Sequence, residues 1–547
     1  MEPWEVAVAY HDRTKHHFHR YAAALGYLDW ATQPDPFRRY AGAPLHKLPL
    51  TGIAAAPSYD DLFAPGAIPP RAVMLATVSA LFEFSLALSA WKQYKDSRWA
   101  LRINPSSGNL HPTEGYLIAG PIDGLQSAPA VYHYAPKEHA LERRTEFAPE
   151  LWNRLMQSLP PESFLVGLTS IHWREAWKYG ERAYRYCQHD AGHAVAAVAL
   201  SAALQGWRTF LLHSPADREV SQLLGLNRAE DYGDAEQEAP DCLIAVVPAS
   251  TNTPIWNAAL DSPSLPAIAK GPWSGRANRL STGHVHWEII DRTAEACIKP
   301  ATPALSTSDG SLAQAIVRDS PSLPARQIIF QRRSAVAFDG ATSITASQFF
   351  LMLDRVLPRW DRPPWQTLGP PVCVHLALFV HLVPGLSPGL YFLVRKPEDL
   401  EVLRKSTKTI LPWTRAKGAP DHLPLFLLIE GDARQVAGQI SCGQDIAADS
   451  AFSLGMIAEF EQPLRLHGAW FYRRLHWEAG AIGQVLYLEA EAAGVRATGI
   501  GCFFDDPMHD LLGLEGHRYQ TLYHFTVGGH VEDTRLTSLP PYPSSPW

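Results

Sequence analysis

The chain repeats itself at a spacing of 288 residues, and this repeat constrains its fold more than any other feature. Tyr184-Arg185 recurs as Tyr472-Arg473, and Gly206 recurs as Gly494 without a gap. The same spacing aligns two longer segments: Asp190-Ala-Gly192 with Glu478-Ala-Gly480, and Leu223-Leu-Gly-Leu226 with Leu511-Leu-Gly-Leu514. Matched halves predict two copies of one fold. If that fold pairs with itself, the copies form an intramolecular pseudo-dimer whose sites lie between the halves.

A chain of 547 residues is too long for one hydrophobic core, so the halves are expected to be separate domains. We predict a first domain over residues 1–250, including an N-terminal arm, and a second over 326–547. Residues 251–325 are rich in Pro, Ser, Thr and Ala and show little periodicity, which is typical of a linker. Its segments around Trp273 and Trp287 are expected to dock on a domain surface.

Helical and strand patterns mix along both halves and predict an α+β fold. A helix is expected over about 70–93, where apolar residues recur near helical spacing. An apolar helix that stops at Gly206 is expected to be central to its domain, and another helix is expected near 347–357. Strand patterns lie at 116–119, 130–134, 242–247, 374–380 and 389–394.

A polar loop is predicted directly after the first of these helices. It runs Arg102-Ile-Asn-Pro105-Ser106-Ser107-Gly-Asn109-Leu-His-Pro112, and its Asn-Pro, Ser-Ser-Gly and His-Pro steps cannot continue a helix or a central strand. Its backbone donors, hydroxyls and carboxamide can hold a flat polar heterocycle, with Arg102 at the entrance. The alternative is an ordinary Pro/Gly/Ser connection. The second half has no copy, because residues 359–365 contain no Ser-Ser-Gly-Asn.

A second asymmetry lies near the end of the repeat. Gly499-Ile-Gly501 stands opposite Leu211-Leu-His213, so only the second half can bring its backbone close to a ligand there. One composite site therefore combines the first half's polar loop with the second half's Gly499 and Gly501, together with Arg332-Arg333-Ser334 and Arg535. The mirror-related site lacks both the loop and the glycines.

Composition excludes several classes of function. Lys+Arg 48 against Asp+Glu 55 gives a formal charge of −7 without a basic block, which disfavours nucleic acid and anionic membranes as partners. The most apolar window, 194–204, is too short to cross a bilayer, so we expect a soluble cytoplasmic protein. Six scattered cysteines without a Cys-x-x-Cys pair argue against a zinc ribbon, an iron–sulfur cluster and a disulfide scaffold.

His189 and His193 share a helix face and have the spacing of metal ligands. No third ligand is identifiable, and the repeat places Trp477 and Ala481 at the matching positions. We therefore favour a buried core or interface histidine pair and predict no metal site.

These motifs together resemble the FMN-dependent nitroreductase superfamily over most of the chain outside the linker. The resemblance implies one FMN between the halves. Its phosphate would be held by Arg332, Arg333, Ser334 and Arg535, groups that suit a phosphate dianion. The partner loop would contribute Pro105, Ser106, Ser107 and Asn109, with Arg102 at its entrance, and Gly499 and Gly501 would approach the flavin ring.

More narrowly, the loop and the segment Trp177-Lys178-Tyr179-Gly-Glu-Arg182 resemble the SagB-type dehydrogenases, which oxidise thiazolines and oxazolines in peptides. In that branch a Lys-Tyr pair is implicated in catalysis, and Lys178-Tyr179 matches it. A lysine buried beside Arg182 could remove a proton while hydride passes to flavin N5, with Tyr179 donating or relaying a proton. The alternative is a structural Lys and Tyr. The well-studied members are mostly single-repeat proteins in synthetase complexes, whereas this chain is a fused tandem.

We therefore expect an FMN-dependent dehydrogenase acting on a small heterocycle or a peptide-borne azoline, and the resemblance allows for a biosynthetic partner protein. Two alternatives stay open. One is an NAD(P)H-dependent reductase of nitro or quinone compounds, and the other is a non-catalytic flavin-binding subunit.

Overall fold

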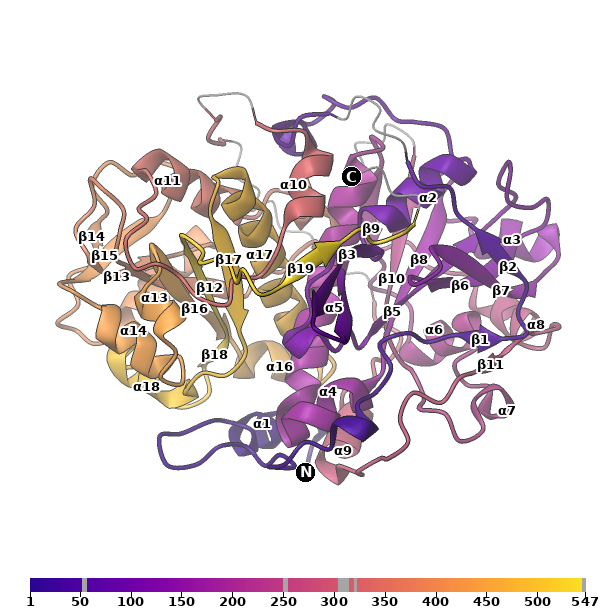
Figure 1. The fold of residues 1–547 in the computed structure, drawn as a ribbon, viewed down its shortest axis with the longest axis horizontal. Coiled ribbons are helices and arrows are strands. Elements are labelled where there is room, and N and C mark those ends of the chain that lie inside the picture. The colour runs from indigo at the N-terminus through magenta and orange to yellow at the C-terminus, as the bar shows by residue number, and fades with distance from the viewer. Residues whose placement is uncertain (52–56, 249–253, 304–313, 319–321, 544–547) are drawn as a thin grey trace.

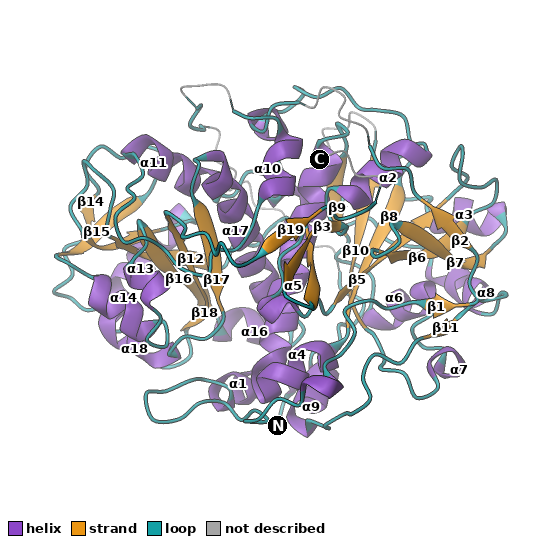
Figure 2. Ribbon diagram, viewed as in Figure 1, coloured by secondary structure: helices purple, strands orange, loops and turns teal. Residues whose placement is uncertain are grey.

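The computed structural model describes residues 1–51, 57–248, 254–303, 314–318 and 322–543. Within these residues, two large mixed α/β units lie at opposite ends of the molecule, and long helices fill the space between them (Figure 1). Strands of each unit gather in one sheet with helices packed around it (Figure 2). This is the α+β tandem arrangement that the repeat predicts.

The first half forms a seven-stranded antiparallel sheet over the described residues, in the order β2-β7-β6-β5-β8-β10-β9. Its strands are β2 (Leu45–Lys47), β5 (Thr113–Ala119), β6 (Ala130–Ala135), β7 (Ala140–Glu146), β8 (Phe164–Ser170), β9 (Arg208–Leu211) and β10 (Ala239–Val247). The helices of this half are α2 (Leu75–Glu83), α3 (Pro149–Leu155), α4 (His172–Tyr179), α5 (Ala183–Ala203), α6 (Asp217–Leu224) and α7 (Ala229–Tyr232).

The second half repeats this sheet in the order β14-β15-β13-β12-β16-β18-β17. Its strands are β12 (Val374–Val380), β13 (Gly389–Leu393), β14 (Thr414–Arg415), β15 (Leu425–Glu430), β16 (Phe452–Glu459), β17 (Arg496–Ile500) and β18 (Tyr519–Gly528). Its helices are α10 (Ala325–Gln331), α11 (Ala346–Arg355), α12 (Trp365–Leu368), α13 (Leu400–Ser406), α14 (Arg434–Ile440), α15 (Asp445–Ala448), α16 (Glu461–His467), α17 (Phe471–Ala492) and α18 (Asp505–Leu512).

The spacing of 288 residues maps elements of one half onto the other. It carries the first residues of β8, α5, β9 and α6 onto the first residues of β16, α17, β17 and α18. The outermost strands are the exception, since β2 precedes all other strands of its sheet along the chain whereas β14 lies between β13 and β15. The repeat is therefore confirmed in the central strands and helices and lost at one sheet edge.

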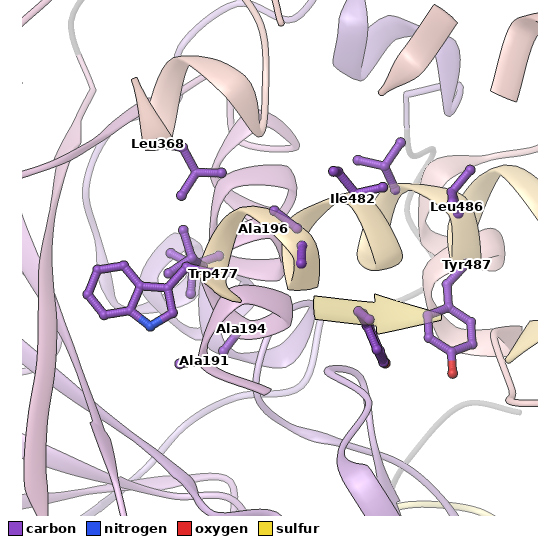
Figure 3. Close-up of a cluster of buried hydrophobic side chains, with 14 of the residues drawn as sticks. Ala191, Ala194, Ala196, Leu368, Trp477, Ile482, Leu486 and Tyr487 are labelled. Atoms are coloured by element: carbon purple, nitrogen blue, oxygen red, sulfur yellow. The ribbon is translucent and has the colours of Figure 1, made fainter. Parts of the chain in front are cut away.

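The core between the halves is built by the two longest helices, α5 and α17, which pack against each other. Both are buried along nearly their whole length, because the apolar face of each helix meets its own sheet and the other helix. Figure 3 shows Ala191 and Ala194 of α5 with Trp477 and Ile482 of α17 in this cluster. The predicted central position of the helix before Gly206 is confirmed.

The helix predicted over 70–93 is wrong in its second part. The helix α2 ends at Glu83, and residues 88–94 form strand β3 (Leu88–Tyr94). This strand lies between β4 (Ser97–Arg102) and β19 (Thr537–Leu539) and bonds to both. Short apolar runs fit either a helix or a strand, and two available strand partners decide the outcome here. The polar loop therefore follows β4 and not the helix.

Each chain end crosses to the opposite half. The helix α1 (Pro3–Arg13) places His11 against Phe460 and Tyr472 of the second half. At the other end, β19 leaves the second half and pairs with β3 of the first, as the yellow strand in Figure 1 shows. Beyond it, the Tyr542 hydroxyl donates to Pro136 O (2.6 Å) and accepts from Leu88 N (3.0 Å). These exchanges tie the halves together.

The described part of the predicted linker packs on both halves, since Trp273 lies against the first and Ile316 N donates to Asp354 of the second (3.1 Å). It contains α8 (Leu265–Ala269), α9 (Glu288–Ala296) and β11 (Arg276–Ala277), which pairs with β1 (Tyr40–Ala41). Trp273 bridges to Thr145, and α9 contacts α1. The expected docking of this segment is confirmed, while residues 249–253, 304–313 and 319–321 lie outside the described residues.

Candidate functional site

A cavity of about 510 Å³ opens between the two halves. The first half lines it with the polar loop and with Tyr179, Tyr186 and Asp190. The second half contributes residues 332–336 and 498–502 and part of the crossing C-terminal segment. The volume lies within the range of small-molecule sites, roughly 300–1,000 Å³. The polar loop and the glycine segment, which are the two features that differ between the repeats, thus line the same cavity.

The polar loop is held in shape by its own side chains and by α5. Gly108 and Asn109 have positive φ angles of 58° and 60°. The Asn109 carboxamide donates to Ala100 O (2.9 Å) and bonds to His111 (2.9 Å), so it is engaged within the protein. Ser107 donates its backbone N–H and its hydroxyl to Asp190, each at 3.1 Å. Pro105, Ser106, Ser107 and Asn109 all line the cavity, as does Arg102.

Asp190 anchors this loop and belongs to a buried carboxyl pair that sequence reasoning missed as part of the site. Burial raises the pKa of Asp190 to about 7. Burial and the neighbouring Asp190 raise the pKa of Glu175 well above its usual range. The repeat held a signal for this role, because the matching residue Glu478 accepts from the backbone N–H of Cys373 (3.0 Å). An acid at both positions anchors backbone in both halves.

Buried arginines give the opposite wall a positive charge. Arg332 donates to Arg102 O (3.0 Å), and its Nε has no partner among the described residues. Burial lowers the pKa of Arg332 and lowers that of Arg333 to about 10, so both stay charged at neutral pH. Ser334 bonds to the Tyr487 hydroxyl (2.9 Å), which also accepts from Gly499 N (2.9 Å). This cluster offers guanidinium and hydroxyl donors to an anion.

The structure does not bring Arg535 to this cluster. Its side chain is 73% exposed and pairs with Asp533 (2.8 Å), and it is not among the residues that line the cavity. Arg496 lines the cavity in its place, at the start of β17, and pairs with Glu532 (2.8 Å). Arg496, and not the predicted Arg535, is therefore the late arginine that lines the cavity. Arg535 is exposed and bonds to the nearby Asp533. Its position late in the sequence does not reveal this local contact.

The glycine segment lets tyrosine rings close on the backbone. A Cβ atom at Gly499 would overlap the Tyr523 hydroxyl, and one at Gly501 would overlap the Tyr186 ring. The Tyr523 ring in turn stacks on His189, with ring centres 4.2 Å apart. Both glycines line the cavity, as the repeat comparison predicts. Their lack of a side chain is what leaves room for the aromatic wall.

Lys178 and Tyr179 lie at the end of α4, against the polar loop. A Cβ atom at Gly108 would stand 3.2 Å from Lys178 Nζ and 2.6 Å from the Tyr179 hydroxyl. Tyr179 lines the cavity, and burial raises its pKa well above the usual value, which keeps the phenol protonated. Lys178 is half-buried, and Arg182 binds Asp505 (3.0 Å).

The mirror-related position is filled. Leu211, Leu212 and His213, which match Gly499 to Gly501, border a space of only about 20 Å³. Arg474 reaches into this region and donates to Gly369 O (2.8 Å), and Lys299 lies over the Trp470 ring. Larger side chains and the docked linker therefore leave one open cavity at this pair of related positions.

His189 and His193 both lie in the interface between the halves. His193 bonds weakly to Gln484 (3.4 Å) and to the Tyr523 hydroxyl (3.3 Å). Burial lowers the pKa of both rings, so both are neutral. In the described part of the chain, no group of three His, Cys, Asp or Glu side chains has an arrangement suited to a metal ion. Every helix there is too short or too polar to traverse a lipid bilayer.

Comparison with known proteins now places the chain. The model of the family described as "Nitroreductase family" matches residues 70–234 and 397–529, one segment in each half. The chain belongs to the nitroreductase family. Membership makes it an oxidoreductase, and each match covers part of one of its two sheets. The finer assignment to the SagB-type branch is not decided by this match.

Individual relatives are distant from this nitroreductase-family chain. A Methanocaldococcus jannaschii protein provisionally named nitroreductase MJ1384 is 26% identical over 150 residues, which are 26% of this chain and 73% of that protein. A crystal structure from Anabaena variabilis, provisionally named a nitroreductase, covers 96% of this chain and 99% of its own, with a TM-score of 0.69 and 21% identity. That likeness shows the tandem fold. An Exiguobacterium sibiricum structure in complex with FMN covers 40% of this chain and 91% of its own, with a TM-score of 0.23 and 11% identity.

Proposed function

We propose that this nitroreductase-family chain binds one FMN in the cavity between its halves and works as a SagB-type dehydrogenase. Its substrate would be an azoline-like heterocycle, free or carried by a peptide. One observation carries the proposal: the polar loop of one half and the Arg332–Ser334 segment of the other line the same cavity. Each half alone lacks one of the two parts.

The residues present fit FMN. Arg332, Arg333 and Ser334, with Arg496, would hold the phosphate, and the partnerless Nε of Arg332 is a donor that a phosphate oxygen would satisfy. The isoalloxazine ring would lie between the loop and the wall that Gly499, Gly501 and the neighbouring tyrosine rings form. When bound, FMN supplies a hydride acceptor at its N5 atom.

Lys178 and Tyr179 are the proposed acid–base pair. Oxidation of an azoline to an aromatic azole removes a hydride from one ring carbon and a proton from its neighbour. Lys178 would accept that proton, and the protonated Tyr179 would donate a hydrogen bond to the heteroatom whose basicity changes. Both groups lie close to Gly108, which lines the cavity together with Tyr179.

The alternative enzyme is an NAD(P)H-dependent nitro or quinone reductase, which family membership alone favours equally. A third possibility is a non-catalytic flavin-binding subunit. The first experiment is the visible spectrum of the purified chain, with heat-released flavin counted per chain. One FMN per chain supports the composite site, and two would mean that the filled mirror position opens.

Anaerobic mixing then separates the candidates. Bleaching of the flavin by thiazoline or oxazoline compounds, with formation of the azole, supports the dehydrogenase. Rapid bleaching by NAD(P)H followed by reoxidation with a quinone would support the reductase instead. A chain that takes up no FMN even when it is supplied in excess would overturn the proposal.

A further inference from the structure

Two cysteines far apart in the sequence meet at the wall of the cavity. Cys442 Sγ and Cys502 Sγ are 2.8 Å apart, although 60 residues separate them. Both are half-exposed, whereas the other four cysteines are buried. Cys502 lines the cavity directly after Gly501, and the Gln444 carboxamide donates to Cys502 O (2.9 Å), which ties the two cysteine-bearing segments together.

The surroundings favour a thiolate at Cys502. Its bond to Cys442, together with His16 and Arg182, lowers its pKa to about 5. Ala22 N–H donates to His16 Nδ1 (3.0 Å), so a neutral His16 ring carries its proton on Nε2. The bond to Cys502 and burial raise the pKa of Cys442, which keeps this second thiol protonated. A thiolate beside a protonated thiol is the arrangement of an attacking and a resolving cysteine.

We infer that Cys442 and Cys502 form a redox-active dithiol that exchanges electrons with small disulfides and dithiols entering the cavity. In the oxidising direction, the Cys502 thiolate attacks one sulfur of a small disulfide and displaces the other as a thiolate. Cys442 then gives its proton to the thiolate displaced first and attacks Cys502 Sγ, which forms the Cys442–Cys502 bond and releases the second sulfur of the small molecule as a thiolate. The protein loses two electrons, and the small disulfide gains them and becomes a dithiol.

The mirror-related position lacks this pair. Ser214 stands where the repeat places Cys502, next to the filled space bordered by His213. The dithiol is thus confined to the same side of the pseudo-dimer as the open cavity. Cys502 directly follows Gly501, so the thiols lie beside the segment that is expected to face the flavin ring. Transfer of the electron pair between the dithiol and bound FMN is a further step, and this step rests on the proposed function.

The dithiol is tested on the full chain, both stripped of flavin and loaded with FMN. The protein is reduced, desalted, treated with oxidised dithiothreitol, quenched in acid, alkylated and digested. We expect a cross-linked Cys442–Cys502 peptide and the loss of two alkylatable thiols in both samples. Cys502→Ser and Cys442→Ser should each abolish the cross-link, whereas Cys297→Ala, which removes a buried thiol elsewhere, should keep it. Two freely alkylated thiols after oxidation would overturn the inference.

Single variants report on the roles of the two sulfurs. With oxidised glutathione, Cys502 in the Cys442→Ser variant should form a mixed disulfide roughly tenfold faster at neutral pH than Cys442 does in the Cys502→Ser variant, because only Cys502 is a thiolate there. Equal rates would overturn the assignment. Far-ultraviolet circular dichroism checks that both variants fold.

The flavin step has its own readout. Reduced dithiothreitol, added anaerobically to FMN-loaded protein, should bleach the flavin in the native chain and not in Cys502→Ser. Cross-linking without any flavin binding would support the dithiol and contradict the proposed function. Flavin binding without cross-linking would support FMN binding and contradict the dithiol.

Discussion

Gly192 and Gly480, which occupy the same position in the two repeats, face each other where α5 crosses α17. A Cβ atom at Gly480 would lie 3.0 Å from Gly192 Cα and 2.9 Å from His193 N, and one at Gly192 would overlap the backbone of Trp477. A pair of equivalent residues in contact is what a two-fold axis requires of an interface between identical subunits. The chain keeps that relationship after fusion of the two copies.

Gly480→Ala should therefore destabilise the interface between the halves. Overpacking a close-packed contact costs about 1–3 kcal/mol, and here the neighbour is rigid backbone. Gly438→Ala in helix α14 is the matched control, since its new Cβ would lie 3.5 Å from Ala448 Cβ, which is an ordinary van der Waals contact. The control should be neutral or stabilising by up to about 1 kcal/mol. Thermal unfolding of both variants checks this, and equal midpoints would contradict the tight crossing.

Arg332→Ala and Arg496→Ala should each weaken FMN binding. Loss of a charge-assisted hydrogen bond costs about 1.5–3 kcal/mol, which is roughly a tenfold to hundredfold rise in Kd. Arg535→Ala should leave Kd unchanged, because that side chain is exposed and bonds to Asp533. Titration of the flavin-free protein, followed by quenching of flavin fluorescence, measures all three. A large effect of Arg535→Ala alone would restore the ligand set expected from sequence.

Asp190→Asn should change how stability depends on pH. The folded-state pKa of Asp190, about 7, lies above its unfolded value, so the folded chain holds the extra proton between these two values. Stability from this group is therefore fully present below the unfolded pKa and is lost as pH rises through about 7. From pH 7 down to pH 4, the native chain should gain up to about 1.4 kcal/mol per pH unit relative to Asp190→Asn. Urea unfolding at several pH values tests this, and parallel curves would refute it.

Lys178→Ala and Tyr179→Phe should lower kcat for azoline oxidation while FMN stays bound. General acid–base groups contribute about 10²–10⁴-fold, and neither residue belongs to the proposed phosphate site. Lys178→Arg separates roles, because it keeps a positive charge at the loop but cannot act as a base near neutral pH. Unchanged single-turnover rates in all three variants would indicate a structural Lys-Tyr pair.

Tyr542→Phe should loosen the crossing C-terminal arm. The variant loses the bond to Pro136 O and leaves Leu88 N unsatisfied, at a cost of about 1–3 kcal/mol. Tyr27→Phe is the control, since that side chain is 82% exposed and its change should stay within about 0.5 kcal/mol. Because the arm also carries Val531, Glu532, Asp533 and Leu536 of the cavity wall, FMN should dissociate faster from Tyr542→Phe. Equal melting temperatures for both variants would contradict the arm's role.

Much of the site could be predicted from sequence where the repeat made its halves comparable. The two halves differ at matching positions, where Gly499 and Gly501 stand opposite Leu211 and His213. This difference predicted one open and one filled position, because larger side chains fill the space that glycines leave. The prediction of a helix over 70–93 was wrong in its second part. That part forms strand β3, because it can pair with β4 and with β19, which is distant in the sequence.

The sequence by itself determined that the chain holds two copies of one nitroreductase-like fold and that the polar loop and the glycine segment occur once each, in opposite halves. Local patterns in the sequence are enough for this, because a repeated segment folds in the same way in both copies and a glycine lacks a side chain wherever it lies. Only the tertiary structure decided that Arg496 and not Arg535 lines the cavity, that Asp190 anchors the loop, and that Cys442 meets Cys502. Those relationships join residues far apart in the chain, and their geometry is set by how the strands and helices pack together, which no spacing in the sequence encodes.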